Sequence, residues 1–75
     1  MITWLNIKPY IIVAEQMKIS NSEAKRLIEQ RAVKFWLDEE WLVFSPLCQY
    51  SPLGVWKVGK GRFFKLITNL KADVS

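Results

Sequence analysis

The sequence predicts an α+β fold in which a two-helix corner (a helix-turn-helix) packs on a small, bent, mainly antiparallel sheet of about four strands. Three observations predict this class. The chain has 75 residues, which is room for one domain with one core. Apolar residues recur at helical spacing as far as Gln30. After Arg31 they alternate with other residues, as they do in strands.

The first helix is expected from Ile7 to Met17. The apolar residues that follow the spacing of one helix face are Tyr10, Val13, Ala14 and Met17. Pro9 suits the first turn of this helix, where a missing N–H breaks no hydrogen bond. Residues 1–6 are expected to form a leader in front of the domain.

The second helix is expected to begin at the segment Ser20-Asn21-Ser22-Glu23. Ser20 is placed to cap it, and Glu23 completes a capping box. Its apolar stripe consists of Ala24, Leu27 and Ile28, and its outward residues are Ser22, Lys25, Arg26 and Glu29. The connection to the first helix is so short that the two helices must meet at a tight corner.

Strands are expected after the helices, over Val33–Leu37, Trp41–Phe44, Val55–Val58 and Arg62–Ile67. The acidic segment Asp38-Glu39-Glu40 is expected as the turn between the first pair. The segment Gly59-Lys60-Gly61 is typical of a hairpin loop, here between the last pair. The domain therefore covers residues 7–67, and residues 68–75, which carry no pattern, are expected to be a disordered tail.

Positive charge predominates and is unevenly distributed. The chain has 11 Lys and Arg residues against 7 Asp and Glu, a net charge of +4, which favours an anionic partner. The basic residues gather in two groups: Lys18, Lys25, Arg26, Arg31 and Lys34, and then Lys57, Lys60, Arg62, Lys65 and Lys71. This distribution is typical of a phosphate-facing surface, and the alternative is a solvated surface of mixed charge.

The residue types that catalysis and metal binding need are scarce. The chain has no His and a single cysteine, Cys48, so it lacks an imidazole base and any internal disulfide. We therefore expect no enzyme activity, no cofactor and no metal site, and a reducing compartment such as the cytoplasm. No apolar run is long enough to span a bilayer, so no membrane partner is expected.

The start of the second helix is a further feature suited to phosphate. A helix N-terminus presents unpaired N–H groups and a partial positive charge. The Ser20 and Ser22 hydroxyls lie at this end, and Lys25 follows one turn further on. The alternative is that Ser20 only caps the helix, and Glu23 at the same end would partly repel an anion.

Residues 20–30 (SNSEAKRLIEQ) and the segment Ala32-Val33-Lys34 resemble the RNA-binding domain named after ribosomal protein S-four. The pattern of that family is Ser, a basic residue, Ser, Glu, Ala, a basic residue, Leu-Ile, a Gly, and a Val that opens a strand. Ile11-Ile12-Val13 matches the apolar heart of its first helix. Residues 56–63 (WKVGKGRF) are similar to the closing hairpin of this domain at the C-terminus of bacterial-type tyrosyl-tRNA synthetases. The resemblance covers roughly residues 7–67.

This resemblance implies a non-catalytic module that binds structured RNA, tRNA or rRNA, through a basic helix face and nearby strand residues. In a synthetase the RNA is the cognate tRNA, held away from its acceptor end, and the parent catalytic domain is a further partner. The implied contact residues, which we expect to converge on one surface, are Ser20, Ser22, Lys25, Arg26, Lys34, Lys60 and Arg62.

The chain departs from the family pattern at several positions. Asn21 and Gly61 stand where basic residues are usual, Arg31 stands where Gly is usual, and Leu37–Glu40 replaces an Asn-Gly turn. At Arg31, either the helix ends differently or about 1 kcal/mol of strain in a left-handed conformation is accepted. The lost basic residues favour an alternative function: a protein–protein interaction module that keeps the fold with RNA binding reduced or lost.

The chain has 4 Trp residues, which also bear on that alternative. We expect these rings chiefly to fill the core or to cover a partner surface. Trp36 and Trp41 flank the acidic turn, and exposed rings there would either dock to another protein or stack on bases. Cys48 is expected to be a small apolar filler.

Overall fold

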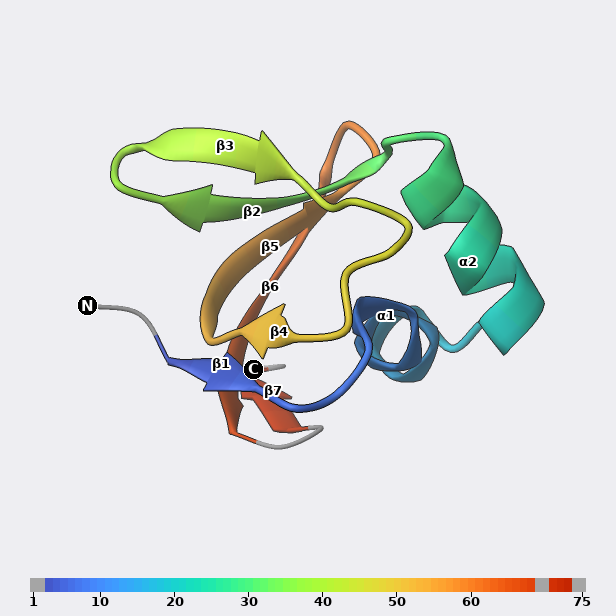
Figure 1. Cartoon of the computed structure of the whole chain (residues 1–75), viewed down its shortest axis with the longest axis horizontal. Helices are drawn as coiled ribbons and strands as arrows, with labels where there is room; N and C mark the ends of the chain where they lie inside the picture. The colour runs from blue at the N-terminus through green and yellow to red at the C-terminus, as the bar shows by residue number, and fades with distance from the viewer. Residues whose placement is uncertain (1–2, 69–70, 74–75) are drawn as a thin grey trace.

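The computed structural model describes residues 3–68 and 71–73, and Figure 1 shows their arrangement. The elements follow the order β1, α1, α2, β2, β3, β4, β5, β6, β7. Both helices pack against one face of a small antiparallel sheet, which confirms the predicted α+β class. Residues 69–70 and 74–75 of the expected disordered tail, like residues 1–2 of the leader, lie outside the described residues.

Helix α1 spans Pro9–Met17 and begins two residues later than expected. Pro9 occupies the first helical turn, and its ring is buried. The core-facing residues are Ile12, Val13 and Ala14. The predicted stripe is confirmed, since Tyr10 and Met17 are half-buried and pack against the core beside Val13 and Ala14, but it omitted the fully buried Ile12.

Helix α2 spans Asn21–Glu29, as predicted from its cap. The Ser20 hydroxyl oxygen accepts a hydrogen bond from the Glu23 backbone N–H at 3.1 Å, which is one of the two bonds of a capping box. After the helix, Arg31 adopts φ 61°, the left-handed conformation that the usual Gly would take without cost. The sequence alternative in which this strain is accepted is therefore confirmed.

The main sheet has five antiparallel strands in the order β3-β2-β5-β6-β7. The strands are β2 (Val33–Leu37), β3 (Glu40–Val43), β5 (Gly54–Val58), β6 (Arg62–Thr68) and β7 (Lys71–Asp73). The predicted strands form the first four positions of this order. The second of them, β3, lies one residue earlier than predicted.

Strand pairing extends beyond the predicted domain at both ends. β1 (Trp4–Leu5), in the expected leader, pairs with β4 (Ser51–Pro52), and β7, in the expected tail, pairs with β6. The buried Ser51 hydroxyl donates to the Ile7 carbonyl at 2.6 Å, which holds the first pair in place. These strands have two or three residues each, so they are too short to carry an alternating pattern that sequence analysis detects.

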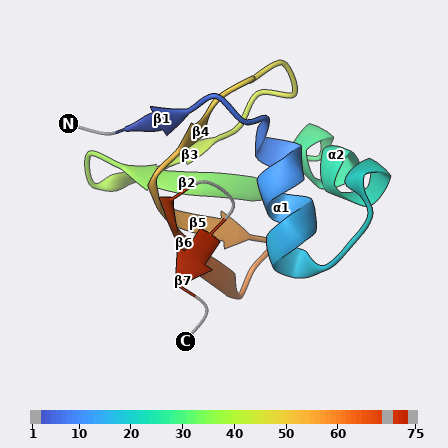
Figure 2. The ribbon, with the colours of Figure 1, turned by 90° about the horizontal axis from the view of Figure 1, so that it is seen from below.

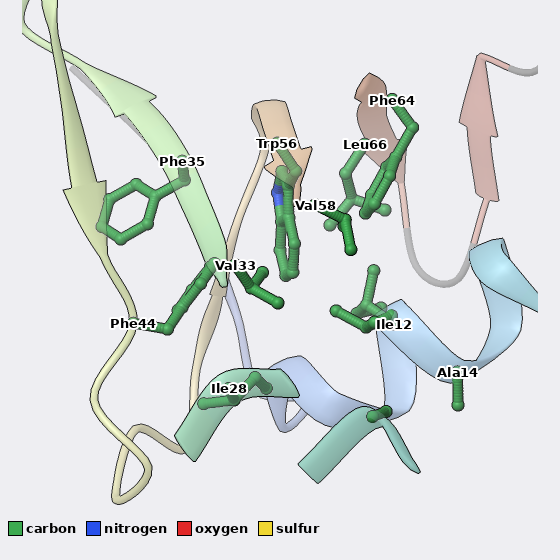
Figure 3. Packing of buried hydrophobic residues seen from close by; sticks show 12 residues of the cluster. Ile12, Ala14, Ile28, Val33, Phe35, Phe44, Trp56, Val58, Phe64 and Leu66 are labelled. Atoms are coloured by element: carbon green, nitrogen blue, oxygen red, sulfur yellow. The ribbon is translucent and has the colours of Figure 1, made fainter. Parts of the chain in front are cut away.

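A row of aromatic rings forms the core on the helix-covered face of the sheet (Figure 3). Ring centroids are 4.6 Å apart between Phe35 and Phe44, 4.6 Å between Phe44 and Trp56, and 5.2 Å between Trp56 and Phe64. The Trp56 indole is fully buried, and its N–H donates to the Pro52 carbonyl at 2.9 Å. The prediction that Trp residues fill the core is therefore confirmed for Trp56.

The β2–β3 connection is a two-residue turn at Asp38 and Glu39, with φ values of 51° and 65°. Two consecutive left-handed residues are the mark of a type I′ turn, which matches the twist of the flanking strands. Asn-Gly adopts this turn with little strain, whereas Asp and Glu adopt it at a cost of roughly 1 kcal/mol or more.

We expect the double substitution Asp38→Asn and Glu39→Gly to raise the free energy of unfolding by about 1 kcal/mol, because it relieves this strain. Urea-induced unfolding measures the change. The control is Gly59→Ala in the β5–β6 turn, where φ is 67° and an added Cβ would meet nothing within 4 Å. It should lose about 1 kcal/mol through backbone conformation alone. A double variant no more stable than the parent chain would contradict the assigned turn.

Candidate nucleic-acid interface

The turn between β5 and β6 lies beside the corner formed by α1 and α2 (Figure 2). Two contacts hold it there: the Gly59 N–H donates to the Ala32 carbonyl at 2.8 Å, and Arg62 Nη1 lies 4.0 Å from the Met17 sulfur. A shallow groove separates the two parts. The residues that line this groove, called here the hairpin groove, are Met17, Ile19, Glu23, Leu27 and 58–62.

The hairpin groove has an apolar floor and a mainly cationic rim. Among the lining residues, Lys60 and Arg62 are exposed cations on the hairpin side of the groove. Glu23 supplies one acidic group to the lining. Because Lys and Arg at a rim pair readily with phosphate oxygens, this groove suits a phosphodiester strand better than a cation.

The exposed side of α2 extends this cationic surface. Ser22 and Arg26 are four residues apart, so they lie on the same face of the helix, and both are exposed. Arg26 is also three residues from the groove-lining Glu23. The structure therefore lines the hairpin groove with two of the predicted contact residues, Lys60 and Arg62, and leaves two others, Ser22 and Arg26, exposed on α2 outside the groove lining.

Ser20 has a demonstrated structural role at the start of α2. Its side-chain oxygen accepts the Glu23 N–H, which satisfies one of the free donors at this helix end. The alternative that Ser20 caps the helix is confirmed. A contact between Ser20 and RNA stays a prediction.

Lys25 and Lys34 lie elsewhere, so the expected convergence of all the candidates on one surface is wrong. The Lys25 ammonium sits 4.6 Å from the centre of the Tyr10 ring, in a separate hollow between the start of α1 and residues 45–49. That hollow shares no lining residue with the hairpin groove. The Lys25 ammonium makes a cation–π contact with the Tyr10 ring on the neighbouring helix. Spacing along α2 alone cannot reveal a contact with another helix.

Lys34 lies on the sheet face turned away from the helices, called here the outer sheet face. It stands between the buried Val33 and Phe35 on β2, and side chains of a strand alternate between faces. The outer-face residues of β2, β3, β5 and β6 include Lys34, Trp36, Trp41, Val43, Lys57, Phe63 and Lys65. Sequence analysis missed Lys57 and Phe63 as candidates, although their alternation with Trp56 and Phe64 carried the signal.

The described residues contain neither a cluster of candidate metal ligands nor a membrane-spanning helix. Among residues 3–68 and 71–73, no three His, Cys, Asp or Glu side chains are grouped as a metal site would need. No helix in the same part of the chain is both long and apolar enough to cross a membrane. Cys48 is partly buried, packs against the core and donates from its sulfur to the Tyr50 carbonyl at 3.2 Å.

Comparisons of the chain with protein-family models, with curated proteins and with solved structures find no match. The arrangement of the side chains therefore carries the functional argument.

We expect Ser20→Ala to lower the free energy of unfolding by about 1 kcal/mol, because the Glu23 N–H loses its partner. The matched control is Ser22→Ala, two residues after the N-cap, where the exposed hydroxyl does not cap the helix. Its free energy of unfolding should change by no more than about 0.5 kcal/mol. Chemical denaturation of both variants measures the difference. Equal effects of the two substitutions would contradict the cap.

Proposed function

We propose that this protein is a non-catalytic RNA-binding module that holds structured RNA, and tRNA in particular, through phosphate contacts. The binding surface consists of the hairpin groove and the exposed side of α2. The observation that carries the proposal is the position of Lys60 and Arg62 against the helical corner, next to the surface with Ser22 and Arg26. Lys60 and Arg62 come from a segment far along the chain from the helices, and the groove that they line also includes residues of both helices.

The shape of the β5–β6 turn supports a contact between Lys60 and the sugar-phosphate backbone of RNA. Gly59 and Gly61 flank Lys60, and an added Cβ at either glycine would meet no atom within 4 Å, so the surroundings of the turn are open. A phosphodiester strand has room to approach Lys60 closely there. Gly61 replaces a basic residue of the S-four-type pattern, so Lys60 and Arg62 on either side of it supply the charge of this turn.

The choice of structured RNA follows from the kind of groups on this surface. Ser, Lys and Arg side chains on a helix and a tight turn contact phosphates and sugars, and such contacts recognise the shape of a folded RNA more than its sequence. The resemblance of residues 20–34 and 56–63 to the S-four-type domain favours tRNA among structured RNAs. A cysteine without an intramolecular partner favours the reducing cytoplasm as the compartment.

The second candidate function is a protein–protein interaction module with RNA binding reduced or lost. Exposed apolar side chains on the outer sheet face favour it: Trp36 is 42% exposed, Val43 43% and Phe63 55%. The acidic Glu23 in the groove favours it too. A parent catalytic domain is one partner that would fit this function.

For the RNA-binding function we expect affinity for tRNA to fall steeply with salt. Four to six phosphate contacts correspond to a log–log slope of roughly −3 to −5. The double variant Arg26→Ala and Lys60→Ala should weaken binding and make the slope less steep by about 2, because two phosphate contacts are lost. Fluorescence anisotropy of labelled tRNA over a series of salt concentrations measures both quantities.

The control for this titration is Lys8→Ala, compared with the single variant Arg26→Ala, which removes the same charge. Lys8 is exposed, lies at the other end of α1 and makes no side-chain cap, so its loss should change neither stability nor the slope appreciably. A flat salt dependence would contradict phosphate binding. A Lys8→Ala effect as large as that of Arg26→Ala would show that net charge, rather than this surface, attracts the RNA.

A further inference from the structure

Three aromatic rings form a row on the outer sheet face, opposite the core. Trp36 and Trp41 are cross-strand partners with ring centroids 5.2 Å apart, and the Trp41 ring lies 5.9 Å from the Phe63 ring. Phe63 is 55% exposed and Trp36 is 42% exposed. In the described part of the chain no helix covers this face, and the Phe63 and Trp36 rings are open to solvent there.

The row is assembled before any ligand arrives. Trp41 belongs to β3 and Phe63 to β6, and strands β2 and β5 lie between them in the sheet. Neighbouring strands are about 4.8 Å apart, so these two backbones are separated by roughly 14 Å along a flat sheet. Ring centroids at 5.9 Å mean that the two side chains converge over the strands between them. The ordering cost of building such a platform has therefore been met on folding.

Positive charge lies among these rings. The Lys57 ammonium is 5.8 Å from the centres of both the Trp41 and Phe63 rings. Lys34 is the cross-strand neighbour of Lys57. Lys65 follows Phe63 on the same face of β6, and its register partner on β7 is Asp73. Among the described side chains of β2, β3, β5 and β6, none that faces outward is acidic.

We propose that the outer sheet face binds an unpaired segment of RNA, with bases stacked on Phe63 and Trp36 and phosphates paired with Lys34 and Lys57. Aromatic rings interleaved with cations are the usual means of holding a single strand, because every base has a flat face and every linkage carries a negative charge. Asp38 and Glu39 lie in the turn beyond Trp36. Their negative charges repel phosphates, so the phosphates are expected near Lys34 and Lys57 instead. The choice of RNA over other single strands rests on the proposed function.

Charge complementarity favours this ligand over a docked protein. An apolar protein surface pressed onto the row would take the Lys57 ammonium out of water without supplying a counter-charge, which is unfavourable. A phosphodiester supplies that counter-charge and stacks its bases on the same rings. RNA therefore satisfies both kinds of group on this face.

The β5–β6 hairpin connects this face to the hairpin groove. Lys57 and Phe63 form a cross-strand pair on the outer face, and the next pair towards the turn is Val58 and Arg62, whose Arg lines the groove. A folded RNA could therefore place its paired region in the groove. An adjacent unpaired stretch would then pass around the β5–β6 hairpin of the protein and reach the outer sheet face. The two sites are thus neighbours with separate residues.

Anisotropy titrations with two labelled probes, a single-stranded oligouridylate and a stable RNA hairpin without unpaired ends, test the proposal. We expect Phe63→Leu, which keeps an apolar side chain and removes the ring, to weaken oligouridylate binding roughly 5- to 100-fold. Phe63→Tyr should restore it. The matched control is Tyr50→Leu, because Tyr50 is 53% exposed and lies outside the five-stranded sheet; this variant should bind like the parent chain.

The outcomes separate this site from the proposed function. Loss of oligouridylate binding in Phe63→Leu with unchanged hairpin binding supports the outer-face site, and the reverse pattern is expected for Arg26→Ala. Oligouridylate binding that is absent, or insensitive to Phe63→Leu, overturns the site, whatever the hairpin probe does. Self-association of the parent chain in sedimentation equilibrium that Phe63→Leu abolishes, without oligouridylate binding, also overturns it and assigns the face to protein docking. Failure of the hairpin probe alone contradicts only the proposed function.

Discussion

Burial of the Trp56 indole is the constraint on which both proposed surfaces depend. Its ring packs between Phe44 and Phe64, and its N–H is satisfied by the Pro52 carbonyl. Because side chains alternate along a strand, an inward Trp56 requires an outward Lys57, and an inward Phe64 requires an outward Phe63. A one-residue slip of β5 would bury a lysine, so the register of the sheet is strongly specified by this one ring.

The β5–β6 hairpin contributes side chains to both of the neighbouring surfaces. Its strands present a ring and an ammonium to the outer sheet face, whereas its turn presents Lys60 and Arg62 to the helical corner. The hydrogen bond from Gly59 to Ala32 joins the turn to the segment between α2 and β2. The positions of Lys57, Lys60, Arg62 and Phe63 therefore follow from the packing of one hairpin and not from a flexible loop.

Local signals in the sequence were sufficient for most of the fold. The Ser20 cap, the α2 stripe and the two hairpins are encoded by residues close together in the chain. The left-handed conformation of Arg31 is one of the two alternatives that its position in the sequence offers. The pairing of β1 with β4 joins residues nearly fifty positions apart through very short strands, which no periodic pattern reports. The candidate site was predicted less well. The packing of Lys25 on Tyr10 depends on how the two helices are assembled, and spacing along one helix does not determine that. Alternation along β2 places Lys34 on the face opposite Val33 and Phe35, but only the assembled sheet separates that face from the hairpin groove.

The most direct test of the account is amide chemical-shift mapping of the isotopically labelled chain during titration with a tRNA. The account predicts that the largest shifts fall on the β5–β6 turn and the exposed side of α2, and that the loop of residues 45–50, on a different part of the surface, stays nearly unchanged. Shifts confined to that loop, or spread evenly over the charged surface, would contradict the claim that this fold presents a defined RNA-binding face.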